Sequence, residues 1–325
     1  MPGKNIILEN LNKDGVDRRG FLKCMAWAGT GTVCLLQGGV LKSFALDDPA
    51  LAVMKSDRIQ HGLAFVQISD SHIGFNKAAN PDVLGTLRTA IAKINALPTP
   101  PAFVLHTGDL SQLSKPEQFD TLDQALKDLR TDKVFYVPGE HDVLDDNGAG
   151  YRERFAKGTI GDGWYSFDNG GAHFIGLVNV MNLKAGGLGA LGSDQLAWLA
   201  KDVQHLKSST PIVVFAHIPL WSVYPDWGWG TSDSEQALSL LKRFGSVTVL
   251  NGHIHQTMRK VEGNVTFHTA MSTAFPQGAP GTVPAPGPIK VPAEKLRSVL
   301  GITDVSFVRG RHTLAVTDST LDSTI

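Results

Sequence analysis

The sequence is poor in cysteine and has no excess of charge of either sign. Its two cysteines, Cys24 and Cys34, both precede residue 45, so the rest of the chain offers no thiol for a disulfide or a metal site. Lysine and arginine total 30 against 31 acidic residues, which argues against a broadly basic surface for nucleic acid. Any metal bound after residue 45 must therefore use histidine and carboxylate ligands.

No apolar run is long enough to predict a stable membrane span. The stretch from about Met25 to Leu41 is short and interrupted by glycine, whereas a spanning helix needs about 20 apolar residues. It follows the pair Arg18 and Arg19 and is succeeded by the small residues of Ser43–Ala45. This order resembles a twin-arginine export signal with its cleavage site. The alternative is a cytoplasmic N-terminus with a chance arginine pair.

The export interpretation divides the chain into a signal over residues 1–45, a linker over 46–59 and one domain over 60–325. The twin-arginine export machinery is then a partner, and the mature protein is periplasmic or otherwise extracytoplasmic. A composition of 42% hydrophobic and 19% charged residues is typical of one large folded core. We expect no nucleic-acid partner, and the sequence defines neither the oligomeric state nor the exact cleavage site.

From residue 60 onward, short apolar runs alternate with helix-like segments. Strand-like runs occupy residues 64–68, 102–105, 134–137, 212–215 and 247–250, and helical periodicity occupies about 81–96, 116–129, 193–206 and 234–244. Hairpins are predicted over 164–177 and 303–317, and an irregular proline-rich loop over 276–292. The alternation predicts an α/β fold with a largely parallel inner sheet covered by helices.

All five strand-like runs end in residues of the types that bind metals. In chain order these are Asp70 and His72, Asp109, Glu140, His217, and His253 and His255. Each short motif arises readily by chance, since aspartate after glycine is ordinary turn chemistry. Five successive strand ends of this kind favour one shared site instead. Imidazole and carboxylate ligands suit iron, manganese, zinc or nickel.

The order of these motifs resembles the calcineurin-like metallophosphoesterase family, whose pattern is D-x-H, G-D, G-N-H-D/E, H and G-H-x-H. The likeness covers about residues 64–256 and is strongest to the cyclic-nucleotide phosphodiesterase-like branch. It implies a four-layer α/β/β/α sandwich, with two mixed sheets flanked by helices and a dinuclear metal site at the sheet edge. One position departs from the pattern, because Glu140 stands where the family has asparagine. The motif here reads G-E-H-D.

The resemblance also implies a role for each matching residue. One metal would be held by Asp70, His72 and His255, the other by Glu140, His217 and His253, and Asp109 would bridge them. The two ions would be divalent or mixed-valence, with iron, manganese or zinc expected. Two cations about 3.5 to 4 Å apart can activate a bridging water and hold the phosphoryl oxygens of an ester.

His141 and Asp142 complete the motif without being expected as ligands. The resemblance implies that His141 approaches the substrate phosphate, as a proton donor or a charge stabiliser, and that Asp142 orients its ring. Glycines precede several of the ligands, at Gly108, Gly139 and Gly252. They suit turns at which the backbone passes close to metals.

The loop after His217 is rich in aromatic residues, with Trp221, Tyr224, Trp227 and Trp229 close together. These rings could form a substrate wall, by stacking on a nucleotide base or by apolar contact with an aryl or lipid ester. A loop that packs on itself or on a partner protein is an equally good interpretation.

These patterns predict an exported, metal-dependent hydrolase of phosphate mono- or diesters, nucleotides among them, that attacks with a hydroxide bridging two metals. The alternative is a catalytically weak metal-binding or partner-binding protein on the same fold, with Glu140 as the mark of lost turnover. The sequence does not separate monoesters from diesters, identify the natural substrate or say how Glu140 affects activity. Hydrolysis of a generic aryl phosphodiester by the metal-loaded protein would distinguish the two hypotheses.

Overall fold

The computed structural model describes residues 32–37, 40–45, 62–308 and 314–324. The predicted arginine pair and all of the predicted linker lie outside these ranges. Strands β1 (Thr32–Gln37) and β2 (Val40–Ala45) form an antiparallel hairpin separate from the two larger sheets. Within the described ranges, no helix combines the length and apolar character that crossing a membrane requires.

The larger sheet has six strands in the order β10-β11-β9-β8-β7-β6. Their bounds are β6 (Tyr165–Asn169), β7 (Ala172–Gly176), β8 (Ile212–Phe215), β9 (Val247–Asn251), β10 (Met258–Glu262) and β11 (Val265–Thr269). The inner strands β7, β8, β9 and β11 run parallel, while the edge strands β6 and β10 are antiparallel to their neighbours. The sheet is therefore mixed rather than purely parallel.

The smaller sheet has five strands in the order β13-β12-β3-β4-β5. Their bounds are β3 (Gly62–Ile68), β4 (Val104–His106), β5 (Val134–Tyr136), β12 (Gly301–Val308) and β13 (Leu314–Thr320). Strands β3, β4 and β5 are parallel, and β12 pairs antiparallel with both β3 and β13. The predicted hairpin over 303–317 is confirmed in its strands, and its turn at 309–313 lies outside the described residues.

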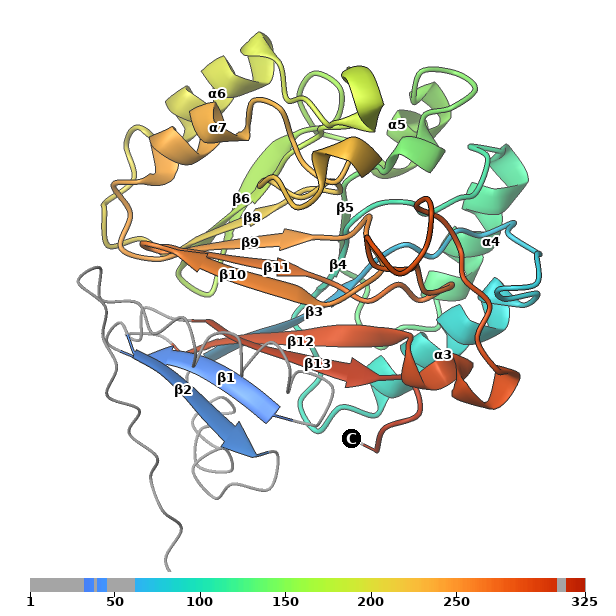
Figure 1. The fold of residues 1–325 in the computed structure, drawn as a ribbon. Coiled ribbons are helices and arrows are strands. Elements are labelled where there is room, and N and C mark those ends of the chain that lie inside the picture. Colours follow the sequence, from blue (N-terminus) through green and yellow to red (C-terminus); the bar gives the residue numbers. More distant parts are fainter. Residues whose placement is uncertain (1–31, 38–39, 46–61, 309–313, 325) are drawn as a thin grey trace, which may run out of the picture.

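Helices cover the outer face of each sheet (Figure 1). Their bounds are α3 (Val83–Asn95), α4 (Pro116–Leu126), α5 (Ala149–Phe155), α6 (Ser193–Val203) and α7 (Ser234–Leu241). Helices α3, α4 and α5 pack on the smaller sheet, and α6 and α7 pack on the larger one. The four predicted helices are confirmed, whereas α5 and the β10–β11 hairpin were not predicted.

Alternation along the strands builds the layers of the core. On β3, Phe65 points into the core between the sheets, while Val66 and Ile68 pack against the helices. On β8, Phe215 joins the same central core and Val214 faces α6 and α7. Because successive side chains of a strand point to opposite faces, each sheet is covered on both sides. The result is the four-layer α/β/β/α sandwich that the resemblance to the metallophosphoesterase family implied.

Candidate metal centre

The seven predicted ligands come together beyond the carboxyl ends of the parallel strands, where α/β sheets commonly bind ligands. Their donor atoms form two groups, each within 4.8 Å: Asp70, His72, Asp109 and His255, and Glu140, His217 and His253. A third, overlapping group joins His141 to Asp109 and Glu140. Both sheets contribute, since β3, β4 and β5 belong to one and β8 and β9 to the other. The structure thus groups these residues as predicted, and their role as ligands stays a prediction.

Asp109 lies between the two groups. Its Oδ2 atom is 3.4 Å from Nε2 of His72 in the first group and 3.4 Å from Nε2 of His217 in the second. Glu140 sits between two histidines of the second group, with one carboxylate oxygen 2.9 Å from Nε2 of His217 and the other 2.9 Å from Nδ1 of His253. The Asp109 oxygen is equally far from one histidine of each group, so it lies where a bridging ligand would lie.

Backbone strain is concentrated at this centre. Five of the seven candidate ligands have left-handed φ angles between 41° and 70°: Asp70, His72, Asp109, His253 and His255. Elsewhere in the described chain, Ser114 and Asn147 alone among non-glycine residues share this conformation. Each such residue costs on the order of 1–3 kcal/mol and persists only where the surrounding fold enforces it. The strained backbone therefore lowers the stability of the fold, and it directs these side chains toward a common point.

Main-chain carbonyls fix the orientation of two of the histidines. Nδ1 of His217 donates to the Thr107 carbonyl oxygen at 2.7 Å, and Nδ1 of His255 donates to that of Phe275 at 2.6 Å. Because a carbonyl can only accept, Nδ1 carries a proton and Nε2 is the ring nitrogen that faces the centre, where it could bind a metal ion. Burial lowers the pKa of His72 to about 3, so this ring is neutral at physiological pH and able to bind a cation.

The donor set fits metal ions. Several buried donor atoms have no hydrogen-bond partner, namely Nε2 of His217, Oε2 of Glu140 and both ring nitrogens of His253. These atoms lie close together but are not aligned for hydrogen bonds with one another. Because buried polar atoms nearly always have a partner, bound metal ions would supply the partners that these atoms lack. Nitrogen and carboxylate oxygen atoms that converge in this way suit iron, manganese or zinc.

Two glycines permit the close approach of the ligand loops. A Cβ atom on Gly139 would overlap Oδ1 of Asp109, and one on Gly252 would overlap Oγ of Ser69 beside Asp70. Only glycine leaves the main chain enough room at these positions. The predicted reason for these glycines, a backbone that passes close to the site, matches the observed packing.

His141 and Asp142 lie in a short 3-10 helix, η1 (Glu140–Asp142), but the expectation that Asp142 orients the His141 ring is wrong. Nδ1 of His141 donates to the Gln112 carbonyl oxygen at 2.8 Å. The buried Asp142 carboxylate instead accepts hydrogen bonds from the loops after β4 and β5, from the backbone N–H groups of Leu110, Ser111 and Gly139 and from Ser111 Oγ. Asp142 therefore holds these two loops together.

The protonation of His141 reflects opposing influences. Burial alone would lower its pKa, but the nearby carboxylates of Asp109 and Glu140 outweigh burial and raise the pKa above its ordinary value. With Nδ1 bound to the Gln112 carbonyl, Nε2 is the ring position at which a proton can be gained or lost. His141 also lines the hollow above the centre, so it can act on a bound molecule.

That hollow has a volume of about 360 Å³ and is lined by both polar and apolar residues. Its polar lining includes His72, Asp109, Glu140, His141 and His253 of the centre, and its apolar lining consists of Phe75, Leu183, Trp227, Trp229, Phe275, Pro286 and Pro288. The aromatic loop was predicted either to form a substrate wall or to pack on itself, and the structure shows both. Trp227 is half-buried and lines the hollow together with Trp229, which is itself buried. Trp221 does not line the hollow and is buried against Phe267, with ring centroids 5.0 Å apart.

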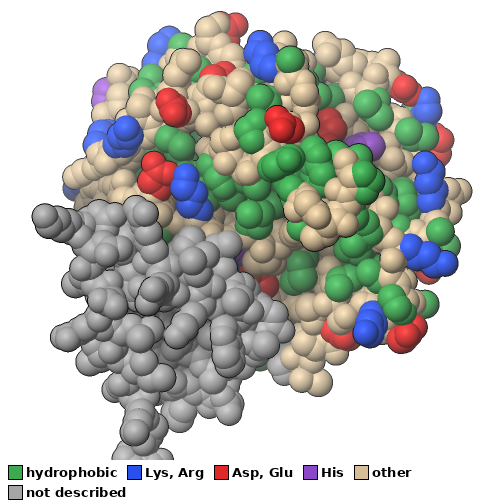
Figure 2. All heavy atoms as spheres, viewed as in Figure 1, with side chains coloured by type: hydrophobic (Ala, Val, Ile, Leu, Met, Phe, Trp, Pro, Cys, Tyr) green, Lys and Arg blue, Asp and Glu red, His purple; other side chains and the backbone are tan. Residues whose placement is uncertain are grey.

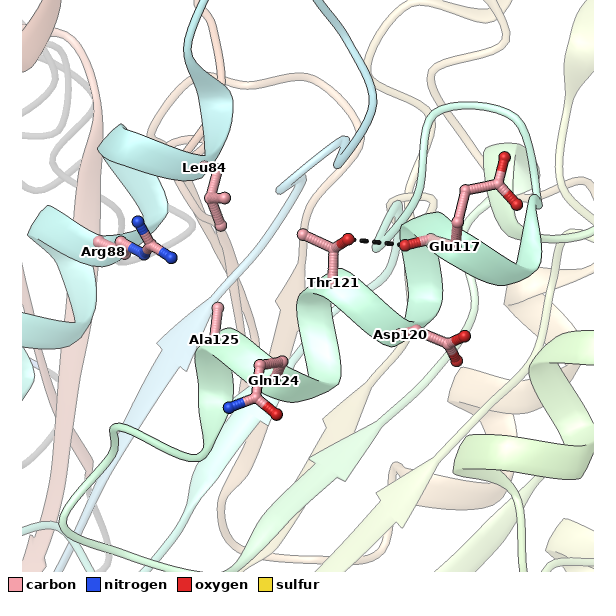
Figure 3. A pocket seen from close by; sticks show the side chains of 7 residues that line it. All are labelled: Leu84, Arg88, Glu117, Asp120, Thr121, Gln124 and Ala125. Atoms are coloured by element: carbon pink, nitrogen blue, oxygen red, sulfur yellow. Dashed lines mark hydrogen bonds between the residues drawn. The ribbon is translucent and has the colours of Figure 1, made fainter.

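A second hollow, of about 400 Å³, lies on the outer surface between α3 and α4 (Figure 3). Arg88 stands on the α3 side, and Glu117 and Asp120 project from α4. It shares no residue with the first hollow and contains no histidine. The residues suited to chemistry therefore gather at the strand ends rather than here.

Several neighbours of the centre escaped the sequence analysis. The Phe275 ring lies 4.7 Å, centroid to centroid, from both His72 and His255, and its carbonyl holds His255. Gln112 acts on His141 through its carbonyl. Main-chain oxygen atoms carry no sequence signal, so these contacts could not be read from residue types.

The fold and this centre together define the class as a metallophosphoesterase. Residues 63–257 match the family model for calcineurin-like phosphoesterases. The chain belongs to that family and is a phosphoric ester hydrolase.

Relatives of several activities are similar to the chain. A 3′,5′-cyclic-nucleotide phosphodiesterase of Nostoc sp. is 26% identical over 66% of this chain and 79% of its own length. A probable glycerophosphodiester phosphodiesterase of Arcobacter nitrofigilis is 26% identical over 64% and 77%. A serine/threonine-protein phosphatase of Rattus norvegicus is 29% identical over 59% and 69%.

Solved structures share the fold at low sequence identity. A dimetal phosphatase from Danio rerio superimposes with a TM-score of 0.57 at 17% identity, covering 79% of this chain and 99% of its own. A purple acid phosphatase from yellow lupin (Lupinus luteus) gives 0.59 at 14% identity, covering 81% and 52%. At this identity the likeness extends to the architecture alone.

Proposed function

We propose that the protein hydrolyses phosphodiesters of small molecules at a two-metal centre, outside the cytoplasm. The observation that carries this proposal is the position of the Asp109 carboxylate, 3.4 Å from a histidine of each donor group. One carboxylate shared by two sets of imidazole and carboxylate donors is the arrangement that a pair of cations requires. Two similar proteins are named as phosphodiesterases, which supports a diester as the substrate.

The charge of the centre also favours a diester. Three carboxylates face it, from Asp70, Asp109 and Glu140, and two divalent cations would leave a net charge of about +1. A phosphodiester carries one negative charge, whereas a monoester carries close to two at neutral pH. The smaller charge of the diester is the better match.

The ligand roles follow the two donor groups. We assign Asp70, His72 and His255 to one ion, Glu140, His217 and His253 to the other, and Asp109 to both. Bound ions supply activation of water and neutralisation of the phosphoryl oxygens. The chain itself orients two of these histidines, His217 and His255, by hydrogen bonds from Nδ1 to the Thr107 and Phe275 carbonyls.

His141 is assigned to the leaving group. The Gln112 carbonyl fixes its ring through Nδ1, which leaves Nε2 to carry a proton at the hollow. Donation of that proton to the departing ester oxygen is general acid catalysis. Asp142 contributes by anchoring the loop on which His141 lies.

The proposal is tested by metal analysis and ester hydrolysis with the purified full-length chain. We expect two metal ions per chain, loss of activity on chelation, and faster turnover of bis(4-nitrophenyl) phosphate than of 4-nitrophenyl phosphate. Asp109→Asn should lose both metal and activity, while Asp120→Asn on the outer helix α4 serves as the matched control. Equal hydrolysis by metal-free protein would overturn the mechanism, and a preference for the monoester would overturn the assigned substrate class.

Export is proposed on the sequence pattern around Arg18 and Arg19. A double variant, Arg18→Lys with Arg19→Lys, should keep the chain in the cytoplasm as an uncleaved precursor in a bacterial host with a twin-arginine pathway. Cell fractionation and immunoblotting measure this directly. Unchanged export and cleavage of the variant would contradict a twin-arginine signal.

A further inference from the structure

We propose that Trp227 and the segment Pro286–Pro288 form a wall that selects the organic group of the substrate, and that this group is a flat aromatic ring. The inference rests on the proposed function, because the ring would belong to a phosphate ester held at the metal centre. Trp227 and this segment line the same hollow as His141 and His253. Residues 286–288 lie outside the stretch that matches the family model, so the family pattern does not account for this side of the pocket.

The distribution of polarity in the hollow points to an apolar ligand group. The polar lining consists of the groups at the candidate metal centre, where the phosphate would bind, together with Gln112, Gln277 and Lys77. Apart from two glycines, the rest of the lining is aromatic rings, Leu183 and prolines. Lys77 is the one lysine among the lining residues, which include no arginine, and it is exposed. Figure 2 shows hydrophobic side chains gathered on the face where the loop between β11 and β12 lies. An apolar wall above a few fixed polar groups is typical of small-molecule sites.

The Trp227 ring is held in place by its neighbours. It ends the short helix η3 (Pro225–Trp227) and lies nearly perpendicular to Trp229, with centroids 5.2 Å apart, and to Tyr224, at 5.4 Å. A Cβ atom on the following Gly228 would come within 2.9 Å of the carbonyl oxygens of residues 186 and 187, so the loop is pressed against its neighbour. A half-buried indole fixed before binding loses little entropy when a ligand stacks on it.

Gln277 connects the Pro286–Pro288 segment of the wall to the metal centre by hydrogen bonds. Its side-chain nitrogen donates to the His253 carbonyl oxygen at 3.0 Å, and its side-chain oxygen accepts from the Gly287 backbone N–H at 3.1 Å. A second hydrogen bond, from the Ile289 N–H to the Pro276 carbonyl oxygen at 3.0 Å, closes the same loop. One amide thus connects the proline segment to the backbone of a candidate ligand. Gln277 is therefore a positioning residue for the wall.

The test compares the binding of phenylphosphonate, cyclohexylphosphonate and methylphosphonate, each as its monomethyl ester so that it carries the single negative charge of a diester, to the full-length, metal-loaded protein by calorimetry. Stacking on one aromatic residue is worth roughly 10-fold to 100-fold in affinity, so phenylphosphonate should bind tighter than methylphosphonate by about this factor. Cyclohexylphosphonate, with a similar apolar bulk but no flat face, should lie between them. Trp227→Ala should reduce the phenyl preference by about tenfold or more and leave methylphosphonate binding unchanged, and Trp227→Phe should restore most of it.

Gln277→Ala should lower the phenyl preference without loss of metal, because it loosens the wall and not the ligands. Gln124→Ala, on the outer helix α4, and Leu144→Ala, an exposed side chain near the centre that does not line the hollow, are the matched controls. Equal binding of the phenyl and methyl compounds by the unaltered protein would overturn the proposal, as would equal losses for both in Trp227→Ala. Cyclohexylphosphonate binding as tightly as phenylphosphonate would overturn the flat ring. The ratio of the phenylphosphonate affinity to the methylphosphonate affinity tests the wall. The absence of any metal-dependent methylphosphonate binding would instead count against the proposed function itself.

Discussion

At the scale of single residues, His141 is the group placed to move a proton. Its ring lies 4.9 Å from that of His72, centroid to centroid, and its Nδ1 is bound to the Gln112 carbonyl. We expect His141→Ala to keep both metal ions but to lower turnover by roughly 10² to 10⁴, the usual range for the loss of a general acid or base. Steady-state kinetics and metal analysis of the same preparation measure the two effects. A collapse of metal content would show instead that His141 is a ligand, as its proximity to Asp109 and Glu140 allows.

Glu140 supplies a negative charge between two histidines of the second donor group. Glu140→Asn keeps an oxygen donor but removes that charge and one methylene of reach. We expect the second metal to be retained less well, because a neutral amide attracts a cation more weakly than a carboxylate does. Metal content after dialysis against a weak chelator measures this, with Glu117→Gln on α4 as the control. Equal retention would mean that the Glu140 carboxylate does not bind metal, and the ligand set would shrink to six.

The grouping of the candidate ligands was predictable from sequence, and the reason is local. Each motif directly follows a strand-like run, and parallel strands deliver their ends to one edge of a sheet. Asp142 was assigned wrongly because adjacency to His141 suggested a contact, whereas the turn of η1 sends its carboxylate to the backbone of the neighbouring loop. The left-handed φ angles of Asp70, His72 and their partners were also beyond reach, since nothing in these residue types demands them.

At the scale of elements, strong periodicity decided what could be predicted. Helices α3, α4, α6 and α7 each have one apolar face buried against a sheet, and they were found. Strand β10 was missed because this edge strand carries Arg259, Lys260 and Glu262 and is only half-buried. Its two-residue turn consists of Gly263, with a left-handed φ of 58°, and Asn264. This Gly-Asn pair is a hairpin signal that the sequence analysis did not use.

The β6–β7 hairpin carries a pH-sensitive contact with α6. Nδ1 of His173 lies 2.8 Å from Oδ1 of Asp168, and its Nε2 lies 2.9 Å from Oδ2 of Asp202 on the helix. Burial opposes protonation of the ring, but hydrogen bonds to Asp202 and Asp168 prevail and raise the pKa of His173 above 6.5. A raised pKa in the folded state stabilises the fold fully below the unfolded value, and this contribution is lost as pH rises through the folded value.

His173→Gln should therefore destabilise the protein more at pH 5.5 than at pH 9. The measurement is the difference in thermal unfolding midpoint between the unaltered protein and the variant at each pH, which cancels other titrating groups. His205→Gln, whose histidine lies just beyond α6, is the matched control. A difference that is constant with pH, or that grows toward alkaline pH, would show that His173 does not gain a proton in the folded state.

At the scale of the whole molecule, the pairing of distant strands was the part that the sequence could not show. Strand β12 pairs with β3, which joins residues 301–308 to residues 62–68 across nearly the full domain. Local patterns predicted both strands but not their partnership, and the alternation of strands and helices suggested one largely parallel sheet. The division into two mixed sheets was expected only from the resemblance to a family. Its physical basis is the central core of Phe65, Phe174, Phe215 and their neighbours between the sheets.

A buried ionic network also joins the two sheets. The Asp318 carboxylate on β13 accepts hydrogen bonds from Arg259 Nη2 on β10 at 2.7 Å, from His268 Nε2 on β11 at 3.1 Å and from Thr303 Oγ1 on β12 at 2.7 Å. Burial opposes its ionisation, but His268 and Arg259 prevail and hold the pKa of Asp318 well below 3.8. The carboxylate is therefore charged in the folded protein at neutral pH, and it links the smaller sheet to the larger one.

Asp318→Asn should weaken this link, because Arg259 and His268 would share a neutral partner in a poorly solvated place. Removal of one partner from such a pair costs on the order of 2–4 kcal/mol of unfolding free energy, measured by denaturant unfolding at pH 7. Since the folded pKa is depressed, the contribution of Asp318 is present above the unfolded value of about 3.8 and is lost as pH falls, so the gap between the two proteins should narrow in acid. Asp322→Asn, an exposed change beyond the end of β13, should shift stability by less than about 0.5 kcal/mol. If Asp318→Asn does no more than this control, the apolar core between the sheets holds them together without the network.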